Sequence, residues 1–233
     1  MAKYKWEKYA DKYNFTSVKK ASFILTAENT REILSGYPLN ENTKILDIGC
    51  GSGEIDILLA QKLNIRIIGI DISQKAIERA KENIMKAGLE NEIKVEYGDV
   101  YNLNYPNEYF DIILSFGYVS VATYPEAIKE VNRVLKSGGF LICDFINPWS
   151  IYKIFKTIRN LFNNKEMPYY LFLSDIKQRF SNNHLSFYRQ ILFNTFPPVN
   201  IRFQLLLFFE KTIGRIFNKI LGRVRLVAFP KNE

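Results

Sequence analysis

The chain has 233 residues, 47% of them hydrophobic, which is enough for one sizeable core or for a core with a small cap. Its single histidine and its two cysteines, Cys50 and Cys143, are too few for a disulfide framework or a zinc site, so we expect reduced thiols, a cytoplasmic protein and no bound metal. The net charge of +8 is uneven: residues 1–149 carry a net −2, whereas 14 basic and 4 acidic residues from Ser150 onward give a net +10.

The first predicted element is an N-terminal helix over residues 5–37, which begins with a cluster of aromatic side chains. Its first turns and the residues ahead of it carry four lysines and no apolar stretch. We therefore expect neither a signal peptide nor a membrane-spanning helix there. Near the other end, the apolar run over residues 205–209 is far shorter than the roughly 20 residues that a bilayer requires.

Residues 44–145 alternate short apolar runs with amphipathic stretches of helical length, a pattern typical of a parallel sheet covered by helices. The predicted strands are residues 44–48, 66–70, 92–97, 110–115 and 140–145, and the predicted helices are residues 54–63, 73–87 and 125–135. Ser73 can cap its helix, Gly88 follows the end of that helix, and Ser137-Gly138-Gly139 predicts a turn into the fifth strand.

After residue 149 the pattern changes. An apolar helical stripe over residues 151–162 has basic residues on its opposite side, residues 185–193 predict a sixth strand, residues 201–221 a long helix, and residues 223–229 a closing seventh strand. We expect one domain over residues 1–233. Its parts are an N-terminal helical cap (1–40), an α/β core that binds a ligand (41–149), a basic and aromatic-rich lid with the sixth strand (150–222), and the closing strand (223–233).

The first strand runs into the segment DIGCGSGE, residues 47–54, so three glycines fall where the chain turns from strand into helix. Glycine permits positive φ angles and a close approach of the backbone to a ligand. The G-x-G-x-x-G fingerprint of dinucleotide-binding enzymes fails, because its sixth position is Glu54 when counted from Gly49 and Asp56 when counted from Gly51. An acidic residue at the helix start disfavours a pyrophosphate but suits the positive sulfonium and amino groups of S-adenosylmethionine.

Two carboxylates follow the next two strands: Asp71 after the second, and Asp99 with its apolar neighbour Val100 after the third. The carboxyl ends of parallel strands meet at one edge of the sheet, where open α/β sheets bind their ligands. There Asp71 can accept hydrogen bonds from both hydroxyls of a ribose, Asp99 can accept one from an adenine amino group, and Val100 can stack on the purine. The alternative is a tight turn followed by two solvated strand ends.

Five segments resemble the successive motifs of class I S-adenosylmethionine-dependent methyltransferases: ILDIGCGSGE, IIGIDIS, YGDV, FDIILS and LKSGGFLICDF, within residues 40–148. The chain is most similar to the small-molecule and lipid group, which includes ubiquinone and menaquinone C-methyltransferases and phospholipid N-methyltransferases. The resemblance implies an α/β, Rossmann-like, mostly parallel sheet of seven strands in the order 3-2-1-4-5-7-6. The seventh strand is then antiparallel, and helices cover both faces.

The resemblance also implies S-adenosylmethionine as the cofactor and S-adenosylhomocysteine as the product. The implied cofactor contacts come from the glycine turn, from the ends of strands two to four and, as in related enzymes, from tyrosines of the N-terminal cap. They are Asp47, Gly49, Cys50, Gly51, Gly53, Asp71, Ile72, Asp99, Val100, Ser115, Phe116, Tyr9 and Tyr13. For the two tyrosines, the alternative is that they pack the N-terminal helix onto the sheet.

Methyl transfer from a sulfonium is an in-line displacement, so alignment in a dry pocket supplies much of the rate, and no obligatory catalytic residue follows. A phenol or carbon acid as acceptor needs a base, for which the candidates are Tyr118, His184 and Asp144. His184 lies in a polar turn and Asp144 at a strand end, so both have structural alternatives. The D/N-P-P-Y signature used for amino groups of bases or glutamine is absent after the fourth strand, where SFGY stands at residues 115–118.

The basic stripes and aromatic residues between 150 and 221 favour an apolar acceptor at an anionic surface. We therefore expect a small or lipid-like acceptor and reversible docking at the inner membrane face, to which each nearby basic side chain contributes roughly 1 kcal/mol. Three alternatives stay open: an ordinary helical lid whose lysines face water, an RNA methyltransferase whose basic region neutralises phosphates, and a non-catalytic protein that binds the cofactor. The acceptor atom and the oligomeric state do not follow from the sequence.

Overall fold

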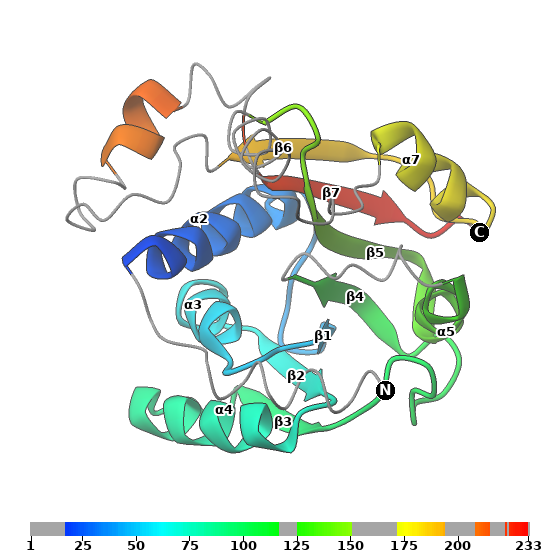
Figure 1. The fold of residues 1–233 in the computed structure, drawn as a ribbon. Helices are drawn as coiled ribbons and strands as arrows, with labels where there is room; N and C mark the ends of the chain where they lie inside the picture. The colour runs from blue at the N-terminus through cyan, green and yellow to red at the C-terminus, as the bar shows by residue number, and fades with distance from the viewer. Residues whose placement is uncertain are drawn as a thin grey trace, which may run out of the picture.

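A mixed sheet organises the fold (Figure 1). The computed structural model describes residues 17–116, 125–150, 172–193, 208–214, 222 and 224–232, and within these ranges seven strands form the sheet in the order β3-β2-β1-β4-β5-β7-β6. The strands are β1 (Lys44–Ile48), β2 (Arg66–Asp71), β3 (Ile93–Tyr97), β4 (Phe110–Ser115), β5 (Leu135–Ile146), β6 (Arg189–Phe193) and β7 (Val224–Pro230). Neighbours from β3 to β5 are parallel, and β7 is antiparallel to both β5 and β6. The predicted strand order and the antiparallel closing strand are confirmed.

Helices cover both faces of the sheet (Figure 1). On one face lie α2 (Ser17–Leu34), α3 (Glu54–Leu63) and α4 (Gln74–Ala87), and on the other lie α5 (Pro125–Val134) and α7 (Leu173–Ser181). Alternate residues of a strand point to opposite faces. Accordingly Ile45 of β1 packs in the cluster that contains Leu25 of α2 and Leu59 of α3, whereas Leu46 packs with Val131 of α5 and Phe180 of α7.

The ends of α4 follow the predicted capping. The Ser73 hydroxyl accepts a hydrogen bond from the Ala76 N–H at 3.3 Å, so Ser73 is the N-cap and the helix begins one residue later than predicted. Gly88 ends the helix with a φ of 66°, and its N–H bonds to the carbonyl oxygens of Ile84 and Met85. Local sequence signals therefore fix both ends of this helix.

The turn predicted at Ser137-Gly138-Gly139 is wrong, because β5 runs through these residues and α5 ends at Val134. The glycines bend the strand without breaking it. Gly138 has a φ of 74°, and the register between β4 and β5 shifts between Phe110 and Ile112. A Cβ atom at Gly139 would lie 2.7 Å from the carbonyl oxygen of Asp111, so the close approach of the two strands requires glycine there.

Other predicted bounds differ in the C-terminal third. The sixth strand begins at Arg189, since Leu185 forms only an isolated bridge with Lys231. Helix α7 was not predicted, and the described part of the predicted helix over residues 201–221 contains a π-helical segment, η2 (Glu210–Gly214). Residues 5–16, 151–162, 201–207 and 215–221, where helix was also predicted, lie outside the described residues.

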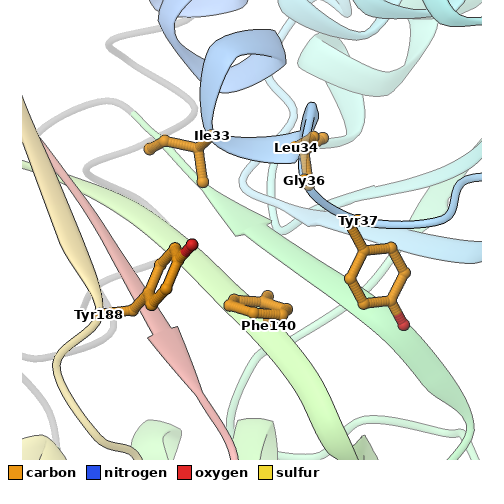
Figure 2. Close-up of a pocket in the computed structure, with 6 residues that line it drawn as sticks. All are labelled: Ile33, Leu34, Gly36, Tyr37, Phe140 and Tyr188. Atoms are coloured by element: carbon orange, nitrogen blue, oxygen red, sulfur yellow. The ribbon is translucent and has the colours of Figure 1, made fainter.

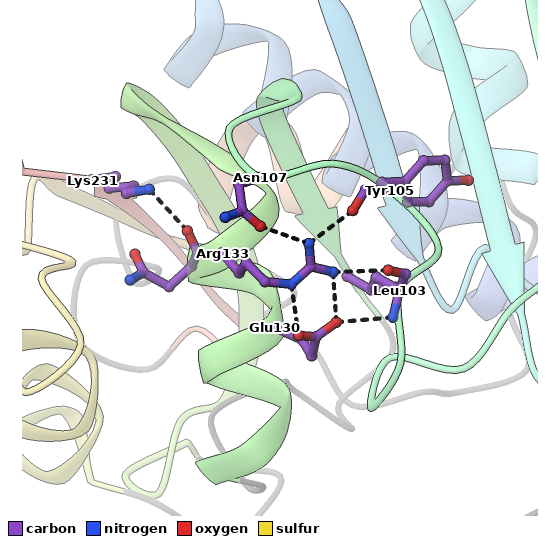
Figure 3. A network of polar contacts seen from close by, with 7 residues as sticks. Leu103, Tyr105, Asn107, Glu130, Arg133 and Lys231 are labelled. Carbon is purple, nitrogen blue, oxygen red and sulfur yellow. Dashed lines mark hydrogen bonds and ion pairs between the residues drawn. The ribbon is translucent and has the colours of Figure 1, made fainter.

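An arginine of α5 fastens the irregular segment between β3 and β4 (Figure 3). Arg133 donates to the carbonyl oxygens of Leu103 and Tyr105 at 2.8 Å each, and to the Glu130 carboxylate at 2.8 and 2.9 Å. Glu130 also accepts from the Leu103 N–H at 3.0 Å, and the hydrogen bond from Arg133 lowers the pKa of Glu130. A connection without regular structure is thus tied to a helix on the α5 face.

Replacing this arginine tests that role. We expect Arg133→Met to lower the free energy of unfolding by about 2 kcal/mol, because it keeps the apolar stem but removes charge-assisted bonds that are partly screened by solvent. Urea denaturation measures the change. Lys81→Met, on an exposed position of α4, is the control and should change the stability by less than about 0.5 kcal/mol. Equal effects of the two substitutions would contradict the prediction.

A small cavity of about 40 Å³ lies between the end of α2 and the start of the sheet (Figure 2). Tyr37 and Tyr188 contact Phe140 edge-on, with ring centroids 5.6 and 5.7 Å apart. Phe140 pairs with Ile112 near the start of β4, so the cavity lies at the amino ends of the parallel strands. Its volume suits roughly one to three water molecules and not a nucleoside. The ligand site must be sought at the other edge of the sheet.

Two further observations limit the kind of site. Among the described helices, none combines the length and the hydropathy that crossing a bilayer requires. Within the same described ranges, no group of three or more His, Cys, Asp or Glu side chains is arranged to hold a metal ion.

Candidate active site

The turn after β1 has the backbone that its glycines predict. Gly49, Gly51 and Gly53 have φ angles of 80°, 58° and 77°, in the left-handed region that favours glycine. The N–H groups of Gly49 and Cys50 both donate to the carbonyl oxygen of Ile70, at 2.8 and 3.0 Å. This glycine turn (residues 49–53) is therefore fastened to β2 before α3 begins.

Asp71 joins the glycine turn to the start of α4. Its carboxylate accepts from the Gly51 N–H at 3.0 Å and from the Ser73 N–H at 2.8 Å. These two bonds orient the half-buried side chain. Asp71 is thus held at the carboxyl edge of the sheet, with its carboxylate against the glycine turn.

Asp99 lies one strand away from Asp71 at the same edge. It follows β3 two residues after Tyr97, which is the partner of Asp71 in the β2–β3 register. The Tyr101 N–H donates to Oδ1 of Asp99 at 3.0 Å, and Val100 packs partly buried against the core of the α5 face. The structure therefore brings together the glycine turn and both carboxylates that the sequence singled out.

The strand register aligns further candidates with this edge. Asp47 pairs with Gly69 on one side and Leu114 on the other, and Leu114 pairs with Ile142. Residues two positions farther along each strand face the same side of the sheet. On β2 and β5 these residues are Asp71 and Asp144, while Gly49 and Phe116 stand one residue past the ends of β1 and β4. The edge thus carries a carboxyl group on each side of the glycine turn, and Asp144 is buried, with 4% of its surface exposed.

A buried carboxyl pair, Asp47 and Asp56, lies directly beneath the glycine turn, and of the two only Asp47 is a predicted site residue. The exposed fraction is 3% for Asp47 and 0% for Asp56, which comes from the first turn of α3. Among the described residues, no group donates a hydrogen bond to Oδ1 of Asp47 or to either carboxyl oxygen of Asp56. The two carboxyl groups interact directly, because each side chain affects the pKa of the other.

Burial raises the pKa of both members of this pair, and that of Asp56 reaches about 7. The pKa of Asp47 is raised further by the negative charge of Asp56 and then by those of Asp71 and Asp144. The pair therefore keeps at least one proton at neutral pH. A sequence signal for Asp56 does exist, because it stands three residues before Leu59, in the buried stripe of α3.

The carboxyl pair needs the glycine beside it on β2. A Cβ atom at Gly69 would lie 2.9 Å from Cys50 Cβ and 3.1 Å from Asp56 Oδ2. We expect Gly69→Ala to lower the free energy of unfolding by about 1 to 3 kcal/mol, because the added methyl group has no space. Gly36→Ala is the matched control, since a Cβ atom at Gly36 meets nothing within 4 Å. Equal urea midpoints for the two variants would contradict this reading of the site.

The remaining predicted site residues are not all at this edge. His184 is exposed in the turn after α7, and the adjacent Leu185 pairs with Lys231, whose N–H donates to the Gly139 carbonyl at the amino ends of the strands. The structure therefore places His184 at the edge opposite the glycine turn. Ser115 is buried and is the last residue of β4. Ile72 is half-buried and directly follows β2. Both lie at the edge that carries the glycine turn. Tyr9, Tyr13 and Tyr118 lie outside the described residues.

Residues 39–210 match a family model described as a methyltransferase domain. The chain belongs to this methyltransferase family. S-adenosylmethionine is the cofactor of the family, as the sequence motifs predicted. The glycine turn fits this cofactor, because the Cβ positions of Gly49 and Gly51 face open space, where a ligand can approach the backbone. The Asp71 carboxylate lies beside them, held by the N–H groups of Gly51 and Ser73.

Named relatives cover part of this methyltransferase chain. The chain is 34% identical over 125 residues to 27-O-demethylrifamycin SV methyltransferase of Amycolatopsis mediterranei. The aligned segment covers 52% of this chain and 45% of that protein. The chain is also 34% identical over 116 residues to demethylmenaquinone methyltransferase of Staphylococcus aureus, covering 48% and 47%. The chain thus spans about half the length of the curated relatives it matches.

Solved structures share the fold over more of the chain. A geranyl diphosphate methyltransferase in complex with SAM superposes with a TM-score of 0.62 at 14% identity, covering 89% of this chain and 85% of that one. The [4+2]-cyclase SpnF superposes with a TM-score of 0.63 at 17% identity, covering 88% and 81%. At these identities the similarity establishes the Rossmann-like fold of the methyltransferase and nothing more.

Proposed function

We propose that this protein transfers the methyl group of S-adenosylmethionine to a small or lipid-like acceptor. The observation that carries the proposal is the position of Asp71, whose carboxylate is bonded to Gly51 and Ser73 at the edge where the glycine turn leaves its backbone open. Family membership and the names of the relatives, which act on a rifamycin and on a menaquinone precursor, support a small-molecule acceptor.

The residues act mainly by holding and aligning. Asp71 would bind the ribose hydroxyls, and Asp99 with Val100 would hold the adenine one strand away. The cofactor supplies an electrophilic methyl group on a positively charged sulfur. The glycine turn presents backbone that can lie against the ligand without side chains between them. Such alignment supports an in-line displacement in which the acceptor attacks from the side of β4 and β5.

Exposed aromatic side chains near the end of β5 support an apolar acceptor. Trp149 and Phe172 have exposed fractions of 65% and 46%, and their ring centroids are 6.3 Å apart. The Trp149 N–H donates to Oδ1 of Asn147, whose Nδ2 donates to the Gly222 carbonyl oxygen at 3.0 Å. These bonds fix the segment that carries Trp149 close to the carboxyl edge. Aromatic surface in such a place is suited to an acceptor with a hydrophobic body.

Asp144 is the base we propose for an acceptor that must lose a proton. It is buried near the end of β5, two strands from the glycine turn, and the acceptor would lie on that side of the cofactor. We expect Asp144→Asn to lower the turnover of such an acceptor by about 100-fold while the affinity for S-adenosylmethionine changes by less than about threefold. Steady-state kinetics and calorimetry measure the two quantities. A loss of affinity without a loss of turnover would contradict this assignment.

Methyl transfer itself can be tested directly. The protein is incubated with methyl-labelled S-adenosylmethionine and separate lipid, quinone, RNA and protein fractions of a cell extract. We expect label in the lipid or quinone fraction, and much less of it when Asp71→Ala replaces the wild type at a cofactor concentration near the wild-type dissociation constant. Label in RNA alone would favour the RNA methyltransferase. No transfer by a protein that binds the cofactor would favour a non-catalytic role or another reaction, as in the cyclase that shares the fold.

Docking on an anionic membrane is a finer part of the proposal. Its support is the net charge of +10 from Ser150 onward, combined with exposed rings such as those of Trp149, Phe172 and Phe208. We expect co-sedimentation with vesicles that contain an anionic phospholipid, weakened when the salt concentration is raised from 50 to about 200 mM. Equal binding to neutral and anionic vesicles would contradict it.

A further inference from the structure

The carboxyl pair Asp47–Asp56 occupies space that the sheet leaves open for it. Asp47 belongs to β1, and its register partner on β2 is Gly69, which has no side chain. The Asp56 carboxyl reaches from α3 into this space, with Oδ2 3.1 Å from where a Cβ atom of Gly69 would stand. Cys50, in the glycine turn, borders the same space, with its Cβ atom 2.9 Å from that Cβ position. The pair is thus built into the floor of the cofactor turn.

The charged groups that shift the pKa values of Asp47 and Asp56 are acidic. Asp71 of β2 and Asp144 of β5 raise the pKa of Asp47, and Glu54 of α3 raises that of Asp56. The Cys50 thiol, whose pKa burial raises well above its usual value, stays neutral. Among the described groups acting on the pair, none is a Lys, an Arg or a His. A negative charge on the pair is therefore compensated by no cation of the described chain.

A cationic ligand over the glycine turn would supply the missing compensation. S-adenosylmethionine carries a sulfonium charge, and its product S-adenosylhomocysteine has a neutral thioether at the same atom. Both share the same amino acid and nucleoside groups. The charge of the buried pair is consequently a means of distinguishing the two, because its interaction with the sulfur position is attractive for one ligand and nearly absent for the other.

We propose that Asp56 is a specificity-determining residue: it shares a proton with Asp47, and binding of the sulfonium cofactor displaces the second proton of the pair wherever it is present, whereas binding of the thioether product leaves the protonation of the pair unchanged. The released proton goes to bulk water, and the remaining one is shared between the two carboxyl groups. The monoanion then stabilises the bound cofactor relative to the product, which favours product release. This inference rests on the proposed function, since it requires that the turn binds S-adenosylmethionine.

Calorimetry of the full chain at pH 7, in two buffers with different ionisation enthalpies, counts the protons released on binding. We expect the wild type to release about half a proton more with S-adenosylmethionine than with S-adenosylhomocysteine, because the pair is about half neutral at this pH. Asp56→Asn removes the shared proton and should abolish the extra release. The amino groups of the two ligands also titrate, but equally with the wild type and with Asp56→Asn, so their contribution cancels when the two proteins are compared. Glu82→Gln, on an exposed position of α4, is the matched control and should behave as wild type.

The affinity ratio gives a second readout. Between pH 6 and pH 8, the preference of the wild type for S-adenosylmethionine over the product should rise about 10-fold, while the ratio for Asp56→Asn should stay constant. A purely structural role of Asp56 would lower both affinities and leave the pH profile of their ratio unchanged. If Asp56→Asn does not fold, the wild-type proton count and pH profile decide alone.

The outcomes separate this inference from the proposed function. If well-folded wild type binds neither ligand, the proposed function fails. If it binds both with the same proton release and a ratio that does not depend on pH, the role of Asp56 is overturned and the proposed function stands. An infrared band of a protonated carboxyl group that is present in the wild type at pH 6 and lost in Asp56→Asn would support the shared proton independently.

Discussion

Asp71→Ala should weaken the binding of S-adenosylmethionine by about 100-fold. Two hydrogen bonds from the ribose hydroxyls to a carboxylate are lost, and each such bond contributes about 1.5 kcal/mol or more. The substitution also frees the N–H groups of Gly51 and Ser73, to which the carboxylate is bonded at 3.0 and 2.8 Å. Titration calorimetry measures the dissociation constant, and circular dichroism checks that the sheet is retained.

Two variants complete this experiment. Asp71→Asn keeps one acceptor oxygen and should fall between the wild type and Asp71→Ala, with a loss of about 10-fold. Asp175→Ala removes the same atoms from an exposed position of α7, on the other face of the sheet, and should leave the affinity unchanged. Unchanged affinity in folded Asp71→Ala would show that the ligand does not lie against this carboxylate.

The free energy of unfolding of the wild type should fall by about 2 to 3 kcal/mol or more between pH 5 and pH 8, of which Asp56 alone accounts for about 2 to 3 kcal/mol. The pKa of Asp56 is 3.8 in the unfolded chain and about 7 in the folded one. Between these values the folded state binds more protons than the unfolded state, so stability decreases as the pH rises, by about 1.4 kcal/mol per unit and per group. Asp47, whose pKa burial also raises, changes stability in the same direction.

Urea denaturation across this pH range measures the effect. The lowered pKa values of Glu108 and Glu130 do not interfere, because the stability they contribute is already complete above pH 5. Asp56→Asn removes one titrating group and gives Asp47 an amide donor, so its stability should change much less with pH. A wild type as stable at pH 8 as at pH 5 would contradict the protonated pair.

The parts of the fold that were predictable are those with redundant local signals. The bounds of β1, β4 and α3 agree with the predicted ranges, because runs of aliphatic residues there are bordered by glycine or by charged residues. The turn predicted at Gly138 is wrong, since two successive glycines are as compatible with a bent strand as with a turn. Helix α7 has a polar composition, and its buried residues Ile176 and Phe180 were too few for its periodicity to stand out.

The candidate site shows the same division. Asp71 and Asp99 were predictable, because parallel strands bring their carboxyl ends to one edge regardless of the detail of packing. Asp56 was missed as a partner of Asp47, since only the register of β1 and β2 and the direction of α3 show that the two meet over Gly69. The position of His184 depends on the antiparallel pairing of β6 and β7. This pairing brings the turn before β6 to the edge of the sheet opposite the glycine turn. The bounds of the cap and lid stay predictions.

The antiparallel strand β7 also constrains the order in which the chain is completed during synthesis. Residues 44–146 contain all five parallel strands, so the edge that carries the glycine turn can form before β7 has left the ribosome. Until then β5 has an unpaired border, and β6, whose neighbour in the sheet is β7, has nothing to join. Nascent chains that stall before residue 224 therefore present an open strand edge, which is a template for association with other chains.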